Sequence, residues 1–202
     1  MPNFKKFLNK KVIFVFIFVL ILVAGGLFFW WQNRETKGSI DDYVIKETAG
    51  GMIVENKKAG LSIKVPDDWE IKKIEKSEGS VVINTPDIQG KEWNKIIVPP
   101  LIKGCGIETS VVYKKMTFEE IKQEVLTIHW GLNVTSEEFE EIIVNSYVAL
   151  KNNFDSEILG SAIVIYIPKG NKLYDFDLYF SPNEQEKCIQ EFERFLETIS
   201  IK

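Results

Sequence analysis

The 202-residue sequence has one histidine and two cysteines, and no stretch of it carries a recognisable catalytic pattern. His129 has no serine or carboxylate partner at a telling spacing, so it does not define a catalytic triad. Cys105 and Cys188 lie far apart, and two cysteines with one histidine do not make a zinc site. We therefore predict no catalytic residues, no metal site and no cofactor, and we expect a protein that is not an enzyme.

Basic residues are in deficit over most of the chain. Four of the 25 Lys and Arg residues lie in the first eleven positions, which leaves 21 to face all 29 Asp and Glu residues beyond position 31, a net charge of about −8. Nucleic-acid binding requires a basic surface, and a polybasic contact with anionic lipid requires clustered lysines. The net charge of residues 32–202 argues against both.

Charged residues are absent from residues 12–31, VIFVFIFVLILVAGGLFFWW. At about 1.5 Å per residue, a helix of this length spans roughly 30 Å, the thickness of the hydrocarbon core of a bilayer. We predict a single transmembrane helix here, with residues 1–11 in the cytoplasm because they hold four lysines and no acid, and with the C-terminal part outside. A cleaved signal peptide ending near 24–26 is the alternative.

The remainder divides into a polar segment and one domain. Residues 32–50 lack apolar periodicity, so we expect a stalk or linker. Residues 51–202 contain alternating strand patterns at 61–65 and 173–180, and a T-x-x-E capping box at 117–120 that begins a helix. We therefore predict one extracytoplasmic α+β domain over residues 51–202.

The stretch ENKKAGLSIKVPDDWEIKK, residues 55–73, resembles the opening of PsbP-like domains, the superfamily that includes Mog1. A hairpin closing on Gly60, an alternating strand and Val-Pro-x-x-Trp at 65–69 carry this resemblance, and residues 161–202 fit the two long strands and final helix with which members end. The resemblance implies an antiparallel sheet with packed helices and a non-catalytic binding or assembly role. The family's partner-contacting residues have no match in this sequence.

A long connection rich in Pro and Gly, residues 85–104, separates two predicted strands. Long ordered loops often form functional surfaces. Trp93 lies in it between Lys91 and Lys95, and we predict that these three residues contact a membrane or envelope protein partner. In the alternative interpretation, Trp93 packs against the sheet.

Both cysteines belong to the predicted external part. Cys105 and Cys188 are disulfide candidates in an oxidising compartment, and the long loop between them would stabilise the fold by about 4 kcal/mol on the chain-entropy model. Two buried free thiols are the alternative.

Two acids alternate within the strand pattern LYDFDLYF. Asp175 and Asp177 share one face of this predicted strand, opposite Tyr174, Phe176 and Leu178. A carboxylate pair of this kind supports a second hypothesis, an envelope hydrolase or a receptor for a small ligand or a metal. Polar residues on the solvated face of a sheet are the simpler interpretation.

Overall fold

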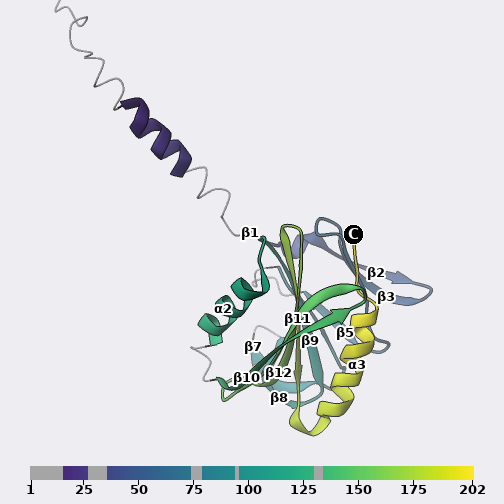
Figure 1. Ribbon diagram of the computed structural model, residues 1–202. Helices are drawn as coiled ribbons and strands as arrows, with labels where there is room; N and C mark the ends of the chain where they lie inside the picture. The colour runs from purple at the N-terminus through teal and green to yellow at the C-terminus, as the bar shows by residue number, and fades with distance from the viewer. Residues whose placement is uncertain (1–15, 27–35, 74–78, 94–95, 130–133) are drawn as a thin grey trace, which may run out of the picture. The chain divides into compact units, whose positions relative to one another are not determined.

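The computed structural model of the chain describes residues 16–26, 36–73, 79–93, 96–129 and 134–202 (Figure 1). The chain divides into two compact units, Met1–Glu35 and Thr36–Lys202. In the first unit, residues 16–26 form a helix of exposed apolar residues. Of the helices within the described ranges, none has the length and the apolar character needed to cross a membrane. The rest of the predicted span, residues 12–15 and 27–31, and the basic residues 1–11 lie outside the described residues.

The second unit is built on an eight-stranded antiparallel sheet, and it confirms the predicted α+β class with packed helices. Seven strands follow the order β10-β11-β12-β13-β9-β6-β5, and β1 pairs with β9 off this path. Their bounds are β10 Val134–Val144, β11 Tyr147–Ser156, β12 Gly160–Lys169, β13 Lys172–Phe180, β9 Cys105–Tyr113, β6 Val81–Asn84, β5 Glu70–Lys73 and β1 Thr36–Lys37.

A second, four-stranded sheet has the order β14-β4-β3-β2. The predicted hairpin is present as β3 (Gly51–Asn56) and β4 (Leu61–Lys64), and the last residues of the chain add β14 (Ser200–Ile201). Residues 36–50 differ from the predicted stalk. They hold a 3-10 turn, η2 (Ile40–Asp42), and β2 (Tyr43–Thr48), which pairs with β3. Because β2 is an edge strand that buries only Tyr43, its sequence shows no apolar alternation.

Within residues 85–104, where the sequence predicted a loop, the described residues form two paired strands. Strand β7 (Gln89–Trp93) pairs with β8 (Ile96–Lys103) as a separate two-stranded sheet. The peptide bond between Pro99 and Pro100 is cis. Prolines are tolerated in β8 because a two-stranded sheet consists entirely of edge strands, in which an N–H group is not required at every position.

Two helices lie on opposite sides of the large sheet (Figure 1). The predicted capping box begins α2 (Phe118–His129): Glu120 accepts a hydrogen bond from the Thr117 N–H at 2.7 Å, and the Glu120 N–H donates to Thr117 Oγ1 at 3.3 Å. After a 3-10 turn, η3 (Pro182–Glu184), the chain forms α3 (Gln185–Glu197), which buries Cys188, Phe192, Phe195 and Leu196.

Strand alternation gives the large sheet two faces of different composition. The apolar face packs against α3 and the four-stranded sheet, and its members are Val81, Ile83, Ile107, Thr109, Val111, Ile163, Ile165, Ile167, Tyr174, Phe176, Leu178 and Phe180. The acid face lies on the α2 side, and its members are Glu108, Ser110, Leu150, Asn152, Phe154, Ala162, Val164, Tyr166, Leu173, Asp175, Asp177 and Tyr179.

Candidate functional site

The acid face brings the predicted pair Asp175 and Asp177 together with a third acid, Glu108. In the strand register, Asp177 of β13 is paired with Glu108 of β9, and Asp175 is paired with Ser110. On the other side of β13, Asp175 is paired with Tyr166 of β12. The period-two alternation predicted for β13 is therefore confirmed, since both aspartates point away from Phe176 and Leu178.

The three carboxyl groups hold protons more strongly than carboxyl groups in water. Burial raises the pKa of Asp175 to about 7, and Glu108 contributes by charge repulsion. Burial, followed by the charge of Asp175, raises the pKa of Asp177 well above its ordinary value. Burial also raises the pKa of Glu108. The side chains of Asp175 and Asp177 also affect each other, which lowers the pKa of Asp175 and raises that of Asp177, so the two carboxyl groups do not titrate independently.

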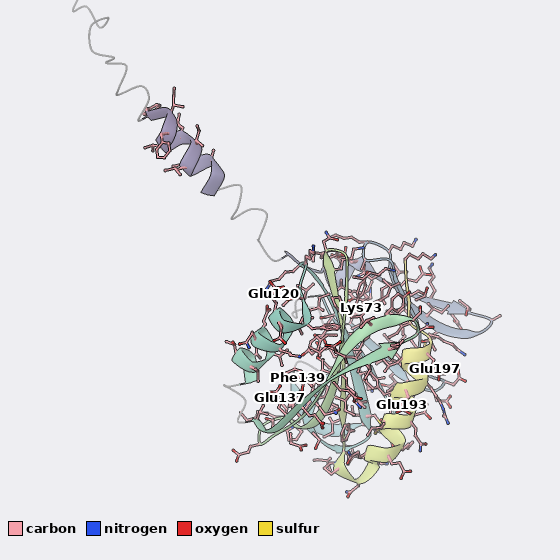
Figure 2. The ribbon with its side chains drawn as sticks, viewed as in Figure 1. Lys73, Glu120, Glu137, Phe139, Glu193 and Glu197 are labelled. Carbon is pink, nitrogen blue, oxygen red and sulfur yellow. A yellow bond between two sulfur atoms is a disulfide. The ribbon has the colours of Figure 1, made fainter. Side chains whose placement is uncertain are left out.

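Two other side chains complete the polar part of this face. The hydroxyl group of Tyr179 donates to Asp177 Oδ2 at 3.4 Å, and burial raises the pKa of Tyr179 well above its usual value. Asn152 of β11 is fully buried and donates from Nδ2 to Glu137 Oε1 at 2.9 Å, while its own Oδ1 has no hydrogen-bond partner among the described residues. Phe139, next to Glu137 on the same side of β10, packs at the edge of the α2 cluster (Figure 2).

The acids are covered rather than displayed to solvent. At one end, Ile121 and Val125 of α2 pack with Leu150, Phe154 and Tyr166 of the acid face, in one buried cluster. At the other end, the segment before β9 closes over the sheet. A Cβ atom on Gly106 would lie 3.4 Å from Ile88, and a Cβ atom on Gly160 would lie 3.5 Å from Pro100 of β8. The solvated sheet face expected for Asp175 and Asp177 is therefore a half-buried layer between α2 and the β7–β8 hairpin.

This arrangement can bind protons, and its carboxyl groups show no metal-binding geometry. Among the residues that the structure describes, no group of three or more His, Cys, Asp or Glu side chains is placed to hold a metal ion. Neighbouring carboxyl groups with raised pKa values also occur in catalytic dyads, but here Ile88 and Pro100 lie close to the same face of the sheet, at Gly106 and Gly160. Sequence reasoning missed Glu108, although its alternation with Ile107 and Thr109 in IETSVVY is the signal that places it beside Asp177.

The two cysteines form a disulfide on the opposite side of the sheet. Cys105 at the start of β9 is bonded to Cys188 in the first turn of α3, and both residues are buried in the cluster of the apolar face. Cys188 comes from the buried side of α3, as the helical spacing of its apolar residues predicted. The bond ties α3 to the strand that pairs with β13.

The predicted partner-contact residues belong to the β7–β8 hairpin. Lys91 is exposed in β7. Trp93 ends β7, where its backbone pairs with Ile96, and its side chain is outside the described part. Lys95 also lies outside the described residues. The structure therefore places Lys91 and the backbone of Trp93 on the same strand, and it leaves the predicted contact untested.

The base of the hairpin is fixed to the body of the domain. Lys103 forms an ion pair with Asp87 at 2.9 Å, and the hydroxyl group of Ser181 donates to the carbonyl oxygen of Ile102 at 2.9 Å. Gly104 adopts a positive φ of 82°, and a Cβ atom there would lie 2.5 Å from Thr85 Oγ1. Only glycine fits this close approach, and Cys105 follows it directly. The hairpin therefore leaves the domain from a rigid attachment point.

Comparison with known proteins identifies structural relatives only. No family model matches the sequence. No curated protein matches it significantly by sequence. Among solved structures, LpqN of Mycobacterium tuberculosis, described as involved in cell envelope biogenesis, aligns with 13% identity over 84% of this chain and 91% of its own, with a TM-score of 0.50. This match supports a shared fold.

Two further solved structures align less closely. The cyanobacterial PsbP protein of Synechocystis has 11% identity over 80% of this chain and 93% of its own, with a TM-score of 0.47. A Bacteroides thetaiotaomicron protein has 15% identity over 85% of this chain, with a TM-score of 0.45, and this chain spans about half (49%) of its length. At these TM-scores the two matches carry no argument about function.

Proposed function

We propose that this chain is a membrane-anchored accessory protein of the cell envelope, which binds another envelope protein through its folded unit without catalysing a reaction. In this proposal residues 12–31 span the membrane, residues 1–11 stay in the cytoplasm, and Thr36–Lys202 lies outside. The apolar run, the four preceding lysines and the absence of acids before position 32 support this orientation.

The disulfide supports the external location. Disulfides persist in oxidising compartments and are rare in the cytosol, where thiols are kept reduced. The Cys105–Cys188 bond joins two buried residues of the same cluster. LpqN, whose fold is similar, is itself described as a protein of cell envelope biogenesis, which is compatible with the same compartment for this chain.

The observation that carries the binding role is the β7–β8 hairpin. It belongs to neither large sheet, it is fixed at its base, and it presents exposed side chains such as Lys91 and Ile102. A rigidly held hairpin loses little conformational freedom when a partner binds, so more of the contact energy appears as affinity. We infer that this hairpin is the surface that contacts the partner.

The alternative function, hydrolysis or ligand reception at Asp175 and Asp177, has weaker support. Both acids lie beneath α2 and the hairpin, and their pKa values are raised by burial. Two half-buried carboxyl groups with raised pKa values have a structural explanation on the acid face, whereas catalysis needs an open approach for the substrate.

The test is chemical cross-linking in the native membrane, with full-length protein carrying a C-terminal tag and mass spectrometry of the products. We expect one reproducible membrane or envelope protein cross-linked to Lys91, Lys95 or Lys103. The matched variant Lys91→Glu should reduce this product, whereas Lys187→Glu in α3 should not. A protein that yields no partner at any of the three lysines would overturn the binding role.

A further inference from the structure

The end of the second unit at which the chain enters has a distinctive surface. Strand β1 brings the chain in beside β9, where Thr36 is paired with Tyr113 and Lys37 with Val112. Across the sheet from Val112, the register continues to Leu173 of β13 and Pro168 of β12. We call this the entry end of the domain.

The turn between β10 and β11 lies at the same end of the sheet and exposes two apolar side chains. Ile143 and Val148 are a cross-strand pair beside the turn, 76% and 56% exposed. The turn itself is firmly held, because Asn145 Nδ2 donates to the carbonyl oxygen of Ile199 at 2.6 Å. A fixed hairpin tip with two exposed β-branched residues suits an apolar environment better than water.

Lysines lie in the turns of the entry end, and one of them, Lys169, lies over the ring of Tyr147 beside the tip at 5.0 Å. The β3–β4 turn contacts the β12–β13 turn, because Lys172 Nζ donates a hydrogen bond to the carbonyl oxygen of Ala59 at 2.9 Å. In the β3–β4 turn, Lys58 lies over the ring of Tyr113 at 4.7 Å from its centroid. Lys169 donates to the carbonyl oxygen of Ile201 at 2.7 Å. The lysines gathered in this way are Lys57, Lys58, Lys114, Lys115, Lys169 and Lys172.

Some negative charge is present at the entry end as well. Asp41 and Asp42 lie in η2, and Asp42 is 3.5 Å from Lys58. Glu55 forms an ion pair with Lys46. The backbone N–H group of Lys202 donates a hydrogen bond to the carbonyl oxygen of Gly60. Glu119 and Glu120 occupy the first turn of α2, and Glu124 pairs with Lys114. The lysines of the β3–β4 and β12–β13 turns nevertheless stand without an acid in the same turn.

The opposite end of the sheet is richer in acids, although Lys103 and Lys187 also lie there. The turn between β11 and β12 contains acids and no lysine, as do the first residues of β10, and two more acids lie at the start of α3. These residues are Glu137, Glu138, Asp155, Glu157, Glu184 and Glu186. The net charge, from which we argued against a lipid contact, therefore conceals a separation of basic and acidic ends.

We propose that the entry end rests on the outer surface of the membrane, with Ile143 and Val148 in the interface and the lysines of its turns on anionic headgroups. This inference rests on the proposed anchoring through residues 12–31, which confines the entry end to the neighbourhood of the bilayer. Lysines near an anionic surface are attracted over about one Debye length, so a surface held this close is within range of the attraction. The acidic end then points away from the membrane, toward partners.

The experiment places a photo-reactive residue at the hairpin tip. The full chain carrying Ile143→p-benzoylphenylalanine is reconstituted into vesicles of phosphatidylcholine alone, or of phosphatidylcholine and phosphatidylglycerol in equal parts. Lipid adducts are counted by mass spectrometry after illumination. The matched control carries the same residue at Ile158, which is exposed in the turn of the acidic end. We expect about tenfold more lipid adduct at 143 than at 158, and more in the anionic vesicles.

Charge variants test the role of the lysines. Lys57→Glu with Lys115→Glu should reduce the adduct at 143 several-fold in the anionic vesicles, whereas Lys91→Glu with Lys187→Glu should not. Equal labelling at 143 and 158, or labelling that Lys57→Glu with Lys115→Glu does not reduce below the level of the control pair, would overturn the inference.

Flotation of the same samples separates this inference from the anchor. A chain that does not float with vesicles of either composition contradicts the anchor itself. A chain that floats without lipid adduct at 143 contradicts only the docking of the entry end.

Discussion

The apolar face and the acid face of the large sheet bury different chemistry, and the acid face is buried less completely. On the apolar face Phe176 meets the edge of Phe195, whose ring stacks on Phe192, and the cluster continues into the four-stranded sheet. On the acid face Glu108, Asp175 and Asp177 occupy the corresponding central positions. The packing of the first face does not depend on protonation, whereas the acid face, which also holds the α2 cluster, loses the contribution of its carboxyl groups as they lose protons.

Truncating one phenylalanine on each face tests the difference between the two faces most directly. Phe176→Ala removes a fully buried ring from between β13 and α3, and we expect a loss of about 4 kcal/mol in the free energy of unfolding. Phe154→Ala removes a ring of the same size from the acid face near its edge, and it should cost less. Urea unfolding of the two variants measures the difference, and equal losses would contradict it.

Removal of the disulfide should have an effect of similar size, and it concerns the apolar face alone. Cys105→Ala with Cys188→Ala removes a bond between residues separated by 83 positions. We expect the free energy of unfolding to fall by about 4 kcal/mol, because the unfolded chain regains the freedom that the bond removes. Urea unfolding in the presence of a reductant, which reaches the buried bond once the chain unfolds, should show a less stable wild-type protein and an unchanged double variant. Insensitivity of the wild-type protein to the reductant would contradict the bond.

The response to pH distinguishes the acid face. The pKa of Asp175 is raised from 3.8 to about 7, so the folded state holds a proton that the unfolded state has lost. The bound proton contributes its full stability below about pH 3.8. This contribution is lost as the pH rises toward about 7. Each such proton gives a slope of about −1.4 kcal/mol per pH unit.

Asp177→Asn should flatten this slope, because an amide can still donate to Asp175 but no longer titrates. The free energy of unfolding, measured between about pH 5 and pH 7, reports the slope in both proteins. An unchanged slope in the variant would show that Asp177 does not hold one of the protons.

The smallest effect comes from a single polar group on the apolar face. Thr109 is fully buried, and among the described residues its Oγ1 has no hydrogen-bond partner. Thr109→Val should stabilise the protein by about 1 kcal/mol, because it removes an unsatisfied hydroxyl group without changing the volume much. Ser110→Ala on the acid face provides the comparison and should change stability less. A loss of stability in Thr109→Val would reveal a partner for the hydroxyl group.

The sequence predicted the elements with strong local signals. Alternation placed Asp175 and Asp177 opposite Phe176, and the capping box at Thr117 located the start of α2. The segments that cover the two faces of the sheet carry no comparable local sequence signal. Pro99 and Pro100 gave residues 85–104 the character of a loop, although β8 tolerates both, so the cover over the acids was not foreseen.

The entry end could not be predicted for a different reason. Its lysines come from turns that are distant in sequence, and only the register of β9, β12 and β13 brings them together. No window of the sequence contains more than two of them side by side, as at Lys57 and Lys58. A charge pattern created by topology is visible only in the folded molecule.

The pairing of β14 with β4 has a consequence for the timing of folding. Ser200 and Ile201, almost the last residues of the chain, complete a sheet whose other strands appear within its first third. Tyr147 and Lys169 also donate hydrogen bonds to Ile201. Because a chain is synthesised from its N-terminus, strands β2 to β4 are made well before Ser200 and Ile201, and β4 lacks its β14 partner until then.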